Sequence, residues 1–322
     1  MQNITRRQLL AAGLGTVGAI AAAGVLNEAL ELLSREDLVP GEPPSPRQLV
    51  PQAWPTADDR LTFAALGDNG SGGRQAMAVA ERLAQTYELV PFGHVSMLGD
   101  IVYYGSIRDR FDDVFVRPMS PLIDAGVDFE LAVGNHDGGI HHSDESLEEI
   151  EAQLRYLGTP DRYYRSGRGP VDFFYLDSSS PGLFGEGSTT QLEWLDDALA
   201  SSTSQWKVVA LHHPLYSSGR HGSTPGAQEL LEPILVRRKV DLVLAGHDHH
   251  YERTVPIDGV THIVSGAGCK TTSVKPSSFT AAAASALEFL HVDIQDDRLL
   301  GRAILPNGDI LDRFELRARE GR

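Results

Sequence analysis

The chain contains a single cysteine, Cys269, among its 322 residues. One thiol can form neither an intramolecular disulfide nor a thiolate-rich metal site. A metal site in this chain would therefore be built mainly from oxygen and nitrogen ligands. Cys269 itself is expected to be a small buried residue.

Positive charge is also scarce, because 28 lysines and arginines stand against 44 aspartates and glutamates, which gives a formal net charge of −16. Nucleic-acid binding needs clustered lysine and arginine, so the net charge argues against this function, and no nucleic-acid partner is expected. Electrostatic attachment to an anionic membrane is disfavoured for the same reason. The hydrophobic fraction of 41% is ordinary for a soluble globular protein, and the length allows one large domain or two small ones.

The N-terminal segment resembles a twin-arginine export signal. Arg6 and Arg7 precede a Gly/Ala-rich apolar stretch that ends near Leu26. This order predicts a signal peptide or anchor over residues 1–30, read by the twin-arginine export machinery, and a periplasmic or extracellular protein. A plain membrane anchor is the alternative, so membrane association is expected only if this segment is retained.

Residues 31–60 are predicted to be an extended linker. They contain six prolines between Pro40 and Pro55. Such density can sustain neither a helix nor a central strand.

From Leu61 onward, short apolar runs alternate with segments of helical spacing. Strands are predicted at Leu61–Leu66, Val95–Leu98, Phe129–Val133, Val171–Leu176, Trp206–Leu211 and Val240–Ala245. Helices are predicted at Arg74–Tyr87, within Ile107–Val116, and at Glu145–Leu157, Thr189–Ala200 and Ala227–Lys239. Strands and turns alone follow from about Tyr251. The pattern indicates one α/β domain over residues 61–318, with parallel strand pairs joined later by antiparallel hairpins.

Polar residues follow directly after several of these strands. The run Gly246-His247-Asp248-His249 comes after Val240–Ala245, and open α/β sheets place ligands past such strand ends. The other polar residues in this position are Asp68, Asp100, Asn135-His136-Asp137 and His212. Carboxylate, amide and imidazole groups suit iron, zinc or manganese, and a carboxylate can bridge two ions roughly 3.5–4 Å apart. His213, next to His212, is a competing ligand.

These residues occur in the order of a known motif set. Gly67-Asp68-Asn69-Gly70, Gly99-Asp100 with Tyr103, Gly134-Asn135-His136-Asp137, His212 and Gly246-His247-Asp248-His249 match the five motifs of the calcineurin-like metallophosphoesterases. The chain resembles that family from about Leu61 to Gly268. The resemblance implies a four-layer αββα sandwich, in which helices flank two mixed β-sheets and a dinuclear metal site lies at the strand ends.

Gly70 and Tyr103 indicate the branch of the family. Most members have a histidine ligand two residues after the first aspartate, where this chain has Gly70. Tyr103 can fill that position with a phenolate, which resembles the small purple acid phosphatases, although aromatic packing beside Tyr104 is the alternative. Free tyrosine has a pKa of about 10, so ionisation needs a strongly Lewis-acidic ion.

The resemblance then implies two ligand sets and two further histidines. Fe(III) would be bound by Asp68, Asp100, Tyr103 and His249. A second ion, Fe(II), Zn or Mn, would be bound by Asp100 as the bridge, Asn135, His212 and His247. His136 and His221 match the histidines beside the metals, although His221 is alternatively an exposed loop residue. Ile101 departs from the family, which usually has asparagine after the bridging aspartate.

The implied reaction is hydrolysis of small phosphate monoesters. A hydroxide held by the metals would attack phosphorus in line, and His136 or His221 would protonate the leaving alkoxide. A phosphodiesterase with the same metals is one alternative. A secreted phosphate-binding protein without turnover is another.

Overall fold

A computed structural model of the chain describes residues 60–103, 107–138, 144–179 and 188–319. All of them belong to one compact unit, Pro46–Arg322. The predicted export signal and, apart from Arg60, the predicted linker lie outside the described residues. In the part of the chain that is described, no helix combines the length and the apolar character needed to cross a membrane.

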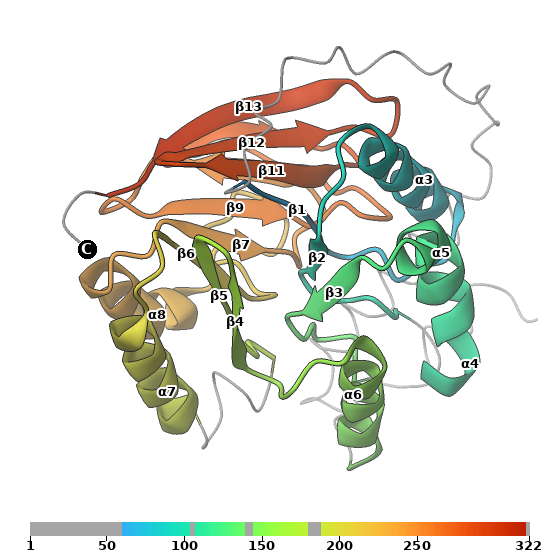
Figure 1. The fold of residues 1–322 in the computed structure, drawn as a ribbon, viewed down its shortest axis with the longest axis horizontal. Helices are drawn as coiled ribbons and strands as arrows, with labels where there is room; N and C mark the ends of the chain where they lie inside the picture. Colours follow the sequence, from blue (N-terminus) through green and yellow to red (C-terminus); the bar gives the residue numbers. More distant parts are fainter. Residues whose placement is uncertain (1–59, 104–106, 139–143, 180–187, 320–322) are drawn as a thin grey trace, which may run out of the picture. The chain divides into compact units, whose positions relative to one another are not determined.

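The first β-sheet has six strands in the order β13-β12-β11-β1-β2-β3 (Figure 1). Its strands are β1 (Leu61–Leu66), β2 (His94–Met97), β3 (Asp128–Leu131), β11 (Phe289–Gln295), β12 (Arg298–Ile304) and β13 (Ile310–Arg317). The first three strands are parallel to one another, whereas β11 pairs antiparallel with β1. The carboxyl ends of β1, β2 and β3 therefore lie at one edge of the sheet.

The second sheet has seven strands in the order β10-β8-β9-β7-β6-β5-β4. They are β4 (Tyr164–Arg168), β5 (Val171–Tyr175), β6 (Trp206–Ala210), β7 (Leu242–Ala245), β8 (Tyr251–Thr254), β9 (Thr261–Ser265) and β10 (Thr280–Ala284). Strands β5, β6, β7 and β9 are parallel, and β4, β8 and β10 add antiparallel pairs. Both sheets are therefore mixed, as expected.

Among the described residues, the α-helices outside the sheets are α3 (Arg74–Leu89), α4 (Ile107–Phe111), α5 (Arg117–Asp124), α6 (Asp144–Leu157), α7 (Ser188–Ser201) and α8 (Pro225–Arg237). Helices α7 and α8 lie beside the second sheet, and α3 and α5 lie beside the first (Figure 1). The helices and sheets bury three apolar layers, two outside the sheets and one between them.

Strand β1 shows how the sequence produces these layers. Phe63 and Ala65 point into the layer between the sheets, whereas Ala64 and Leu66 point into the layer under the helices. Successive side chains of a strand alternate between its faces, so a continuous apolar run is needed where both faces are covered. This confirms the α/β fold of two mixed sheets flanked by helices.

Two elements differ from the sequence prediction. Strand β4 was not predicted, because Arg165 to Arg168 is polar; it is an edge strand in which only Tyr164 is buried. The helical region after Ile107 continues past the predicted limit through a π-helical turn, Asp112–Val116, into α5. Pro118 stands in the first turn of α5, directly after the π-helical turn. Because proline has no N–H, it cannot donate a helical hydrogen bond to the preceding turn, and the helix is irregular at this point.

Glu288, just before β11, provides a test of the fold in solution. Its side chain is fully buried and accepts hydrogen bonds from the Ser265 hydroxyl at 2.9 and 3.0 Å. Burial raises the pKa of Glu288 to about 8.

A carboxyl group whose pKa is raised on folding stabilises the fold fully below its unfolded pKa. That contribution is lost as the pH rises through the folded pKa. Between about pH 4.5 and pH 8, we expect the free energy of unfolding to fall by a few kcal/mol because of this group.

Glu288→Gln should remove this pH-dependent decrease in the free energy of unfolding. Glu88→Gln, at an exposed glutamate, should retain it. Urea denaturation at a series of pH values measures the difference. A pH dependence that is identical in the parent and in Glu288→Gln would contradict the assignment.

Candidate metal centre

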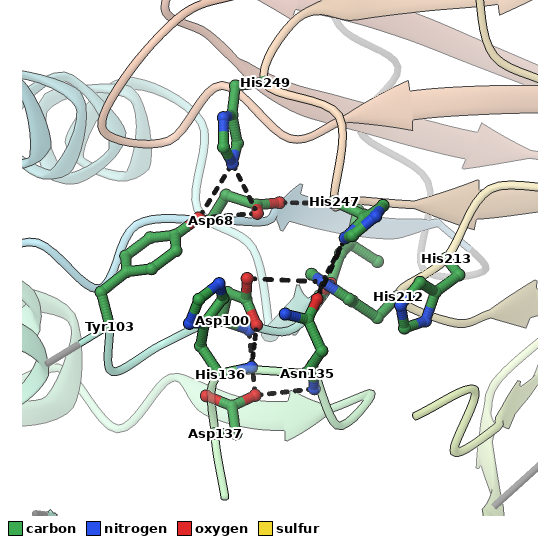
Figure 2. A network of polar contacts seen from close by, with 12 residues as sticks. Asp68, Asp100, Tyr103, Asn135, His136, Asp137, His212, His213, His247 and His249 are labelled. Carbon is green, nitrogen blue, oxygen red and sulfur yellow. Dashed lines mark hydrogen bonds and ion pairs between the residues drawn. The ribbon is translucent and has the colours of Figure 1, made fainter. Parts of the chain in front are cut away.

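The polar residues predicted from the sequence lie together where strands of both sheets end. Asp68, Asp100 and Asn135 follow β1, β2 and β3 of the first sheet, while His212 and His247 follow β6 and β7 of the second. Figure 2 shows their side chains pointing toward one another across the space between these loops. The site therefore depends on the packing of the two sheets and not on one sheet alone.

The first group of donor atoms comes from Asp68, Tyr103 and His249. The Tyr103 hydroxyl donates to Asp68 Oδ1 at 2.8 Å and lies 3.1 Å from His249 Nε2. His249 Nε2 is in turn 3.3 Å from Asp68 Oδ1. All three side chains are buried.

The second group comes from Asn135, His212 and His247, with Asp100 beside them. Asn135 Oδ1 is 3.0 Å from both His212 Nε2 and His247 Nδ1, and these two ring nitrogens are 3.3 Å apart. Asp100 Oδ2 lies 3.4 Å from His212 Nε2. Ligand atoms of Asp68, Asp100 and His212 all lie within 4.8 Å of one another, so Asp100 stands between the two groups.

The surroundings of His212 fix which ring nitrogen faces the site. Its Nδ1 lies 2.8 Å from the carbonyl oxygen of Leu98 and donates to it, which directs Nε2 toward Asn135. Burial lowers the pKa of His212, but the Asp100 carboxylate outweighs burial and raises the pKa to about 10. The buried Asp100 carboxylate therefore stabilises a positive charge beside it. A metal cation can supply that charge in place of the proton on His212.

The phenol of Tyr103 lies in an environment that disfavours its ionisation. Burial, and then the charges of Asp68 and Asp100, raise the pKa of Tyr103 well above its usual value. On its own the group is a neutral hydrogen-bond donor to Asp68. Only a cation of high charge at this spot would favour the phenolate, as expected for a ferric ion.

Several of these residues have an unusual backbone conformation. Asp68, Asp100 and His247 have φ angles of 59°, 55° and 69°, in the left-handed region that side chains other than glycine rarely adopt. Such strain costs about 1–3 kcal/mol at each residue and is concentrated at functional sites. The strain and the convergence of side chains thus occur at the same residues.

Gly70 explains why the first donor group contains a tyrosine. A Cβ atom at this position would lie 2.5 Å from the backbone of Ile101 and Val102. The Gly70 carbonyl also accepts a hydrogen bond of 3.1 Å from the Tyr103 backbone N–H. In this backbone no side chain fits at residue 70, and the same close contact holds the Tyr103 segment beside Asp68.

Two aspartates of the motifs fix loops and do not face the donor groups. Asp137 accepts backbone N–H groups from Gly134, Asp100 and Ile101 at 2.7–2.9 Å. Asp248 accepts the Ser217 hydroxyl at 2.5 Å and the backbone N–H groups of His221 and Gly222 at 2.9 and 3.1 Å. The sequence suggested Asp137 as a ligand, but its oxygens are already used by the backbone.

The remaining predicted histidines line the site. The His136 ring centroid lies 5.0 Å from that of Tyr103, and the His221 ring lies 4.4 Å from that of His247. His213 also packs 4.4 Å from the His247 ring, and it is hydrogen-bonded to the Ser178 hydroxyl at 3.0 Å. A ligand atom of His213 lies within 4.8 Å of those of His212 and His247, so His213 remains a competing ligand for the second ion.

Ile101, where the family usually has asparagine, is fully buried and joins the apolar layer beneath the helices. Its backbone N–H is bound by Asp137. Ile101 therefore contributes packing, and its apolar side chain offers no ligand atom to the site.

The chain is similar to several known proteins. Over 256 residues, the chain is 27% identical to human tartrate-resistant acid phosphatase type 5, which covers 68% of this chain and 76% of that protein. Among solved structures, purple acid phosphatase PPD1 from yellow lupin seeds matches with a TM-score of 0.67 and 21% identity, over 80% of this chain and 54% of that one. GAP50, the anchor in the inner membrane complex of Plasmodium, matches with a TM-score of 0.69 and 18% identity, over 81% of this chain and 90% of that one. At these identities the two structures show the shared fold.

The family model for the calcineurin-like phosphoesterases matches residues 61–251, which include every strand-end motif that contributes to the two donor groups. The fold, the motifs and this match place the chain in the calcineurin-like phosphoesterase family.

Proposed function

We propose that the protein is an acid phosphatase of the purple acid phosphatase type, which hydrolyses small phosphate monoesters at a centre of two metal ions. The observation that carries the proposal is the convergence of Asn135 Oδ1, His212 Nε2 and His247 Nδ1 within 3.0–3.3 Å, with the Asp68–Tyr103–His249 group next to them.

The chemistry of the side chains fits such a centre. Asp68, Tyr103 and His249 would hold Fe(III), and Asn135, His212 and His247 would hold Fe(II), Zn or Mn, with Asp100 shared between the two ions. Hard oxygen donors and imidazoles are the ligands that these ions prefer. Two bound cations would supply Lewis acidity, which activates water and offsets negative charge on the phosphoryl oxygens.

The histidines beside the two donor groups would donate the proton that the leaving alkoxide takes up. His136 is held by its backbone N–H, which donates to Asp100 Oδ1 at 2.8 Å, and His221 is held by Asp248. Each anchor uses the backbone N–H of the histidine, and the two imidazole rings lie beside the Tyr103 and His247 rings of the donor groups. We propose that one of the two rings, as an imidazolium, donates a proton to the departing alkoxide.

Comparing substrates tests the proposed specificity. We expect hydrolysis of p-nitrophenyl phosphate, a monoester, to be faster by at least tenfold in kcat/KM than hydrolysis of bis(p-nitrophenyl) phosphate, a diester, which corresponds to about 1.4 kcal/mol. A reversed preference would favour the phosphodiesterase alternative. A metal-loaded protein that hydrolyses neither substrate would favour a phosphate-binding role without turnover.

The proposal also includes the export route. Arg6 and Arg7 are expected to act as the address that the twin-arginine machinery reads, so changing both to lysine should leave the protein in the cytoplasm. Immunoblotting of cell fractions, with a substitution of Arg47 by lysine as the control, measures this. Unchanged export of the double variant would point to a different route.

A further inference from the structure

Lys270 lies in a loop that the candidate metal centre holds in place on both sides. The loop follows β9, and the backbone N–H of Gly268 donates to the Gly67 carbonyl at 3.1 Å. Two residues past Lys270, the Thr272 N–H donates to the His249 carbonyl at 2.7 Å. The loop is thus bound to two segments that each carry a donor residue of the first group.

The neighbour of Lys270 is also fixed. Cys269 is 3% exposed and packs against Tyr103 and Ala76. A Cβ atom on Gly268 would lie 2.4 Å from the Gly67 carbonyl oxygen, so only glycine permits this approach of the loop. These contacts determine where the backbone of Lys270 lies relative to the tyrosine.

The side chain of Lys270 ends over the tyrosine ring. Its Nζ atom is 4.0 Å from the centroid of the Tyr103 ring, within the range of a cation–π interaction. Tyr103 is 2% exposed and Lys270 is partly buried, so the charge acts on the ring with less screening than in bulk water. Neither the family motifs nor the proposed reaction assigns a role to Lys270.

We propose that Lys270 is a positioning residue that tunes the electron donation of Tyr103 to the metal at the first donor group. This inference rests on the proposed function, because it needs Tyr103 to bind Fe(III) as the phenolate. A fixed positive charge over the ring stabilises the electrons of the phenolate and reduces their donation to the ion.

Two measurable consequences follow. Charge transfer from a phenolate to Fe(III) moves an electron away from the ring, so a cation above the ring raises the energy of that transition and moves the absorption maximum to shorter wavelength. The same charge favours uptake of an electron by the iron. Lys270 is therefore expected to raise the reduction potential of the site.

Two Lys270 variants and one control separate charge from packing. Lys270→Met keeps a long apolar side chain and removes the charge, whereas Lys270→Arg keeps the charge. The control is Lys275→Met, at an exposed lysine in the same loop. Each full-length protein is loaded with iron, and its visible spectrum, reduction potential and iron content are measured together.

We expect the absorption maximum of Lys270→Met to move to longer wavelength and its reduction potential to fall, with Lys270→Arg and Lys275→Met close to the parent. An absorption maximum and a potential that stay at the parent's values in Lys270→Met would overturn the inference. Equal shifts in Lys270→Met and Lys275→Met would also overturn it. The parent's own band tests the proposed ferric site, so the two questions have separate answers.

Discussion

Replacing Asp100 with alanine is expected to remove metal from both sites and to reduce hydrolysis of p-nitrophenyl phosphate by more than about a thousandfold. Asp100 lies between the two donor groups, with Oδ2 3.4 Å from His212 Nε2. It also accepts the His136 backbone N–H at 2.8 Å through its other oxygen. In the proposed centre this one carboxylate would serve both ions, and it also holds the loop after β3.

Metal analysis of the purified variant, together with its activity, measures this effect. Asp128→Ala is the matched control, because Asp128 is an exposed aspartate at the opposite end of β3 from the site. The control is expected to keep the parent's metal content and activity. Two metal ions per chain in Asp100→Ala would defeat the assignment of Asp100 as the shared ligand.

Replacing Tyr103 with phenylalanine is expected to remove the colour of the protein while the fold is retained. The ring keeps its packing against Cys269 and His136, and only the hydroxyl that contacts Asp68 and His249 is lost. Without the phenolate, the proposed visible charge-transfer band to Fe(III) would be lost. The activity should fall much less than in Asp100→Ala, since Asp100 and the second donor group are intact.

Visible spectroscopy and circular dichroism of this variant and its parent distinguish the two roles of Tyr103. Loss of the visible band with an unchanged far-ultraviolet spectrum is the predicted outcome. If Tyr103 is only a packing residue, the variant will match the parent in both colour and metal content.

The extent to which the sequence predicts the fold depends on where each element lies. Strands covered on both faces, such as β1 and β7, appear as short apolar runs, and their positions were predicted to within one or two residues. The edge strand β4 has no such signal, because most of its side chains face solvent. The turn Asp258-Gly259 was also predicted, and its residues have φ angles of 47° and 83°.

The site is predictable where local sequence determines it. A polar residue after a glycine at a strand end is visible in the sequence, and the structure brings these side chains together. The sequence does not show that Asp137 and Asp248 fix loops. Their carboxylates do so by accepting backbone N–H groups up to 37 residues away. Lys270 has no motif at all, and only the folded loop places it over Tyr103.

Metal analysis of the purified parent protein, combined with its visible spectrum, tests the proposed dinuclear centre. We expect two metal ions per chain, at least one of them iron, and a broad visible band from charge transfer between Tyr103 and Fe(III). A protein that binds no metal, or only one ion per chain, would contradict the dinuclear centre. A colourless protein with two zinc or manganese ions would contradict the ferric site at Tyr103.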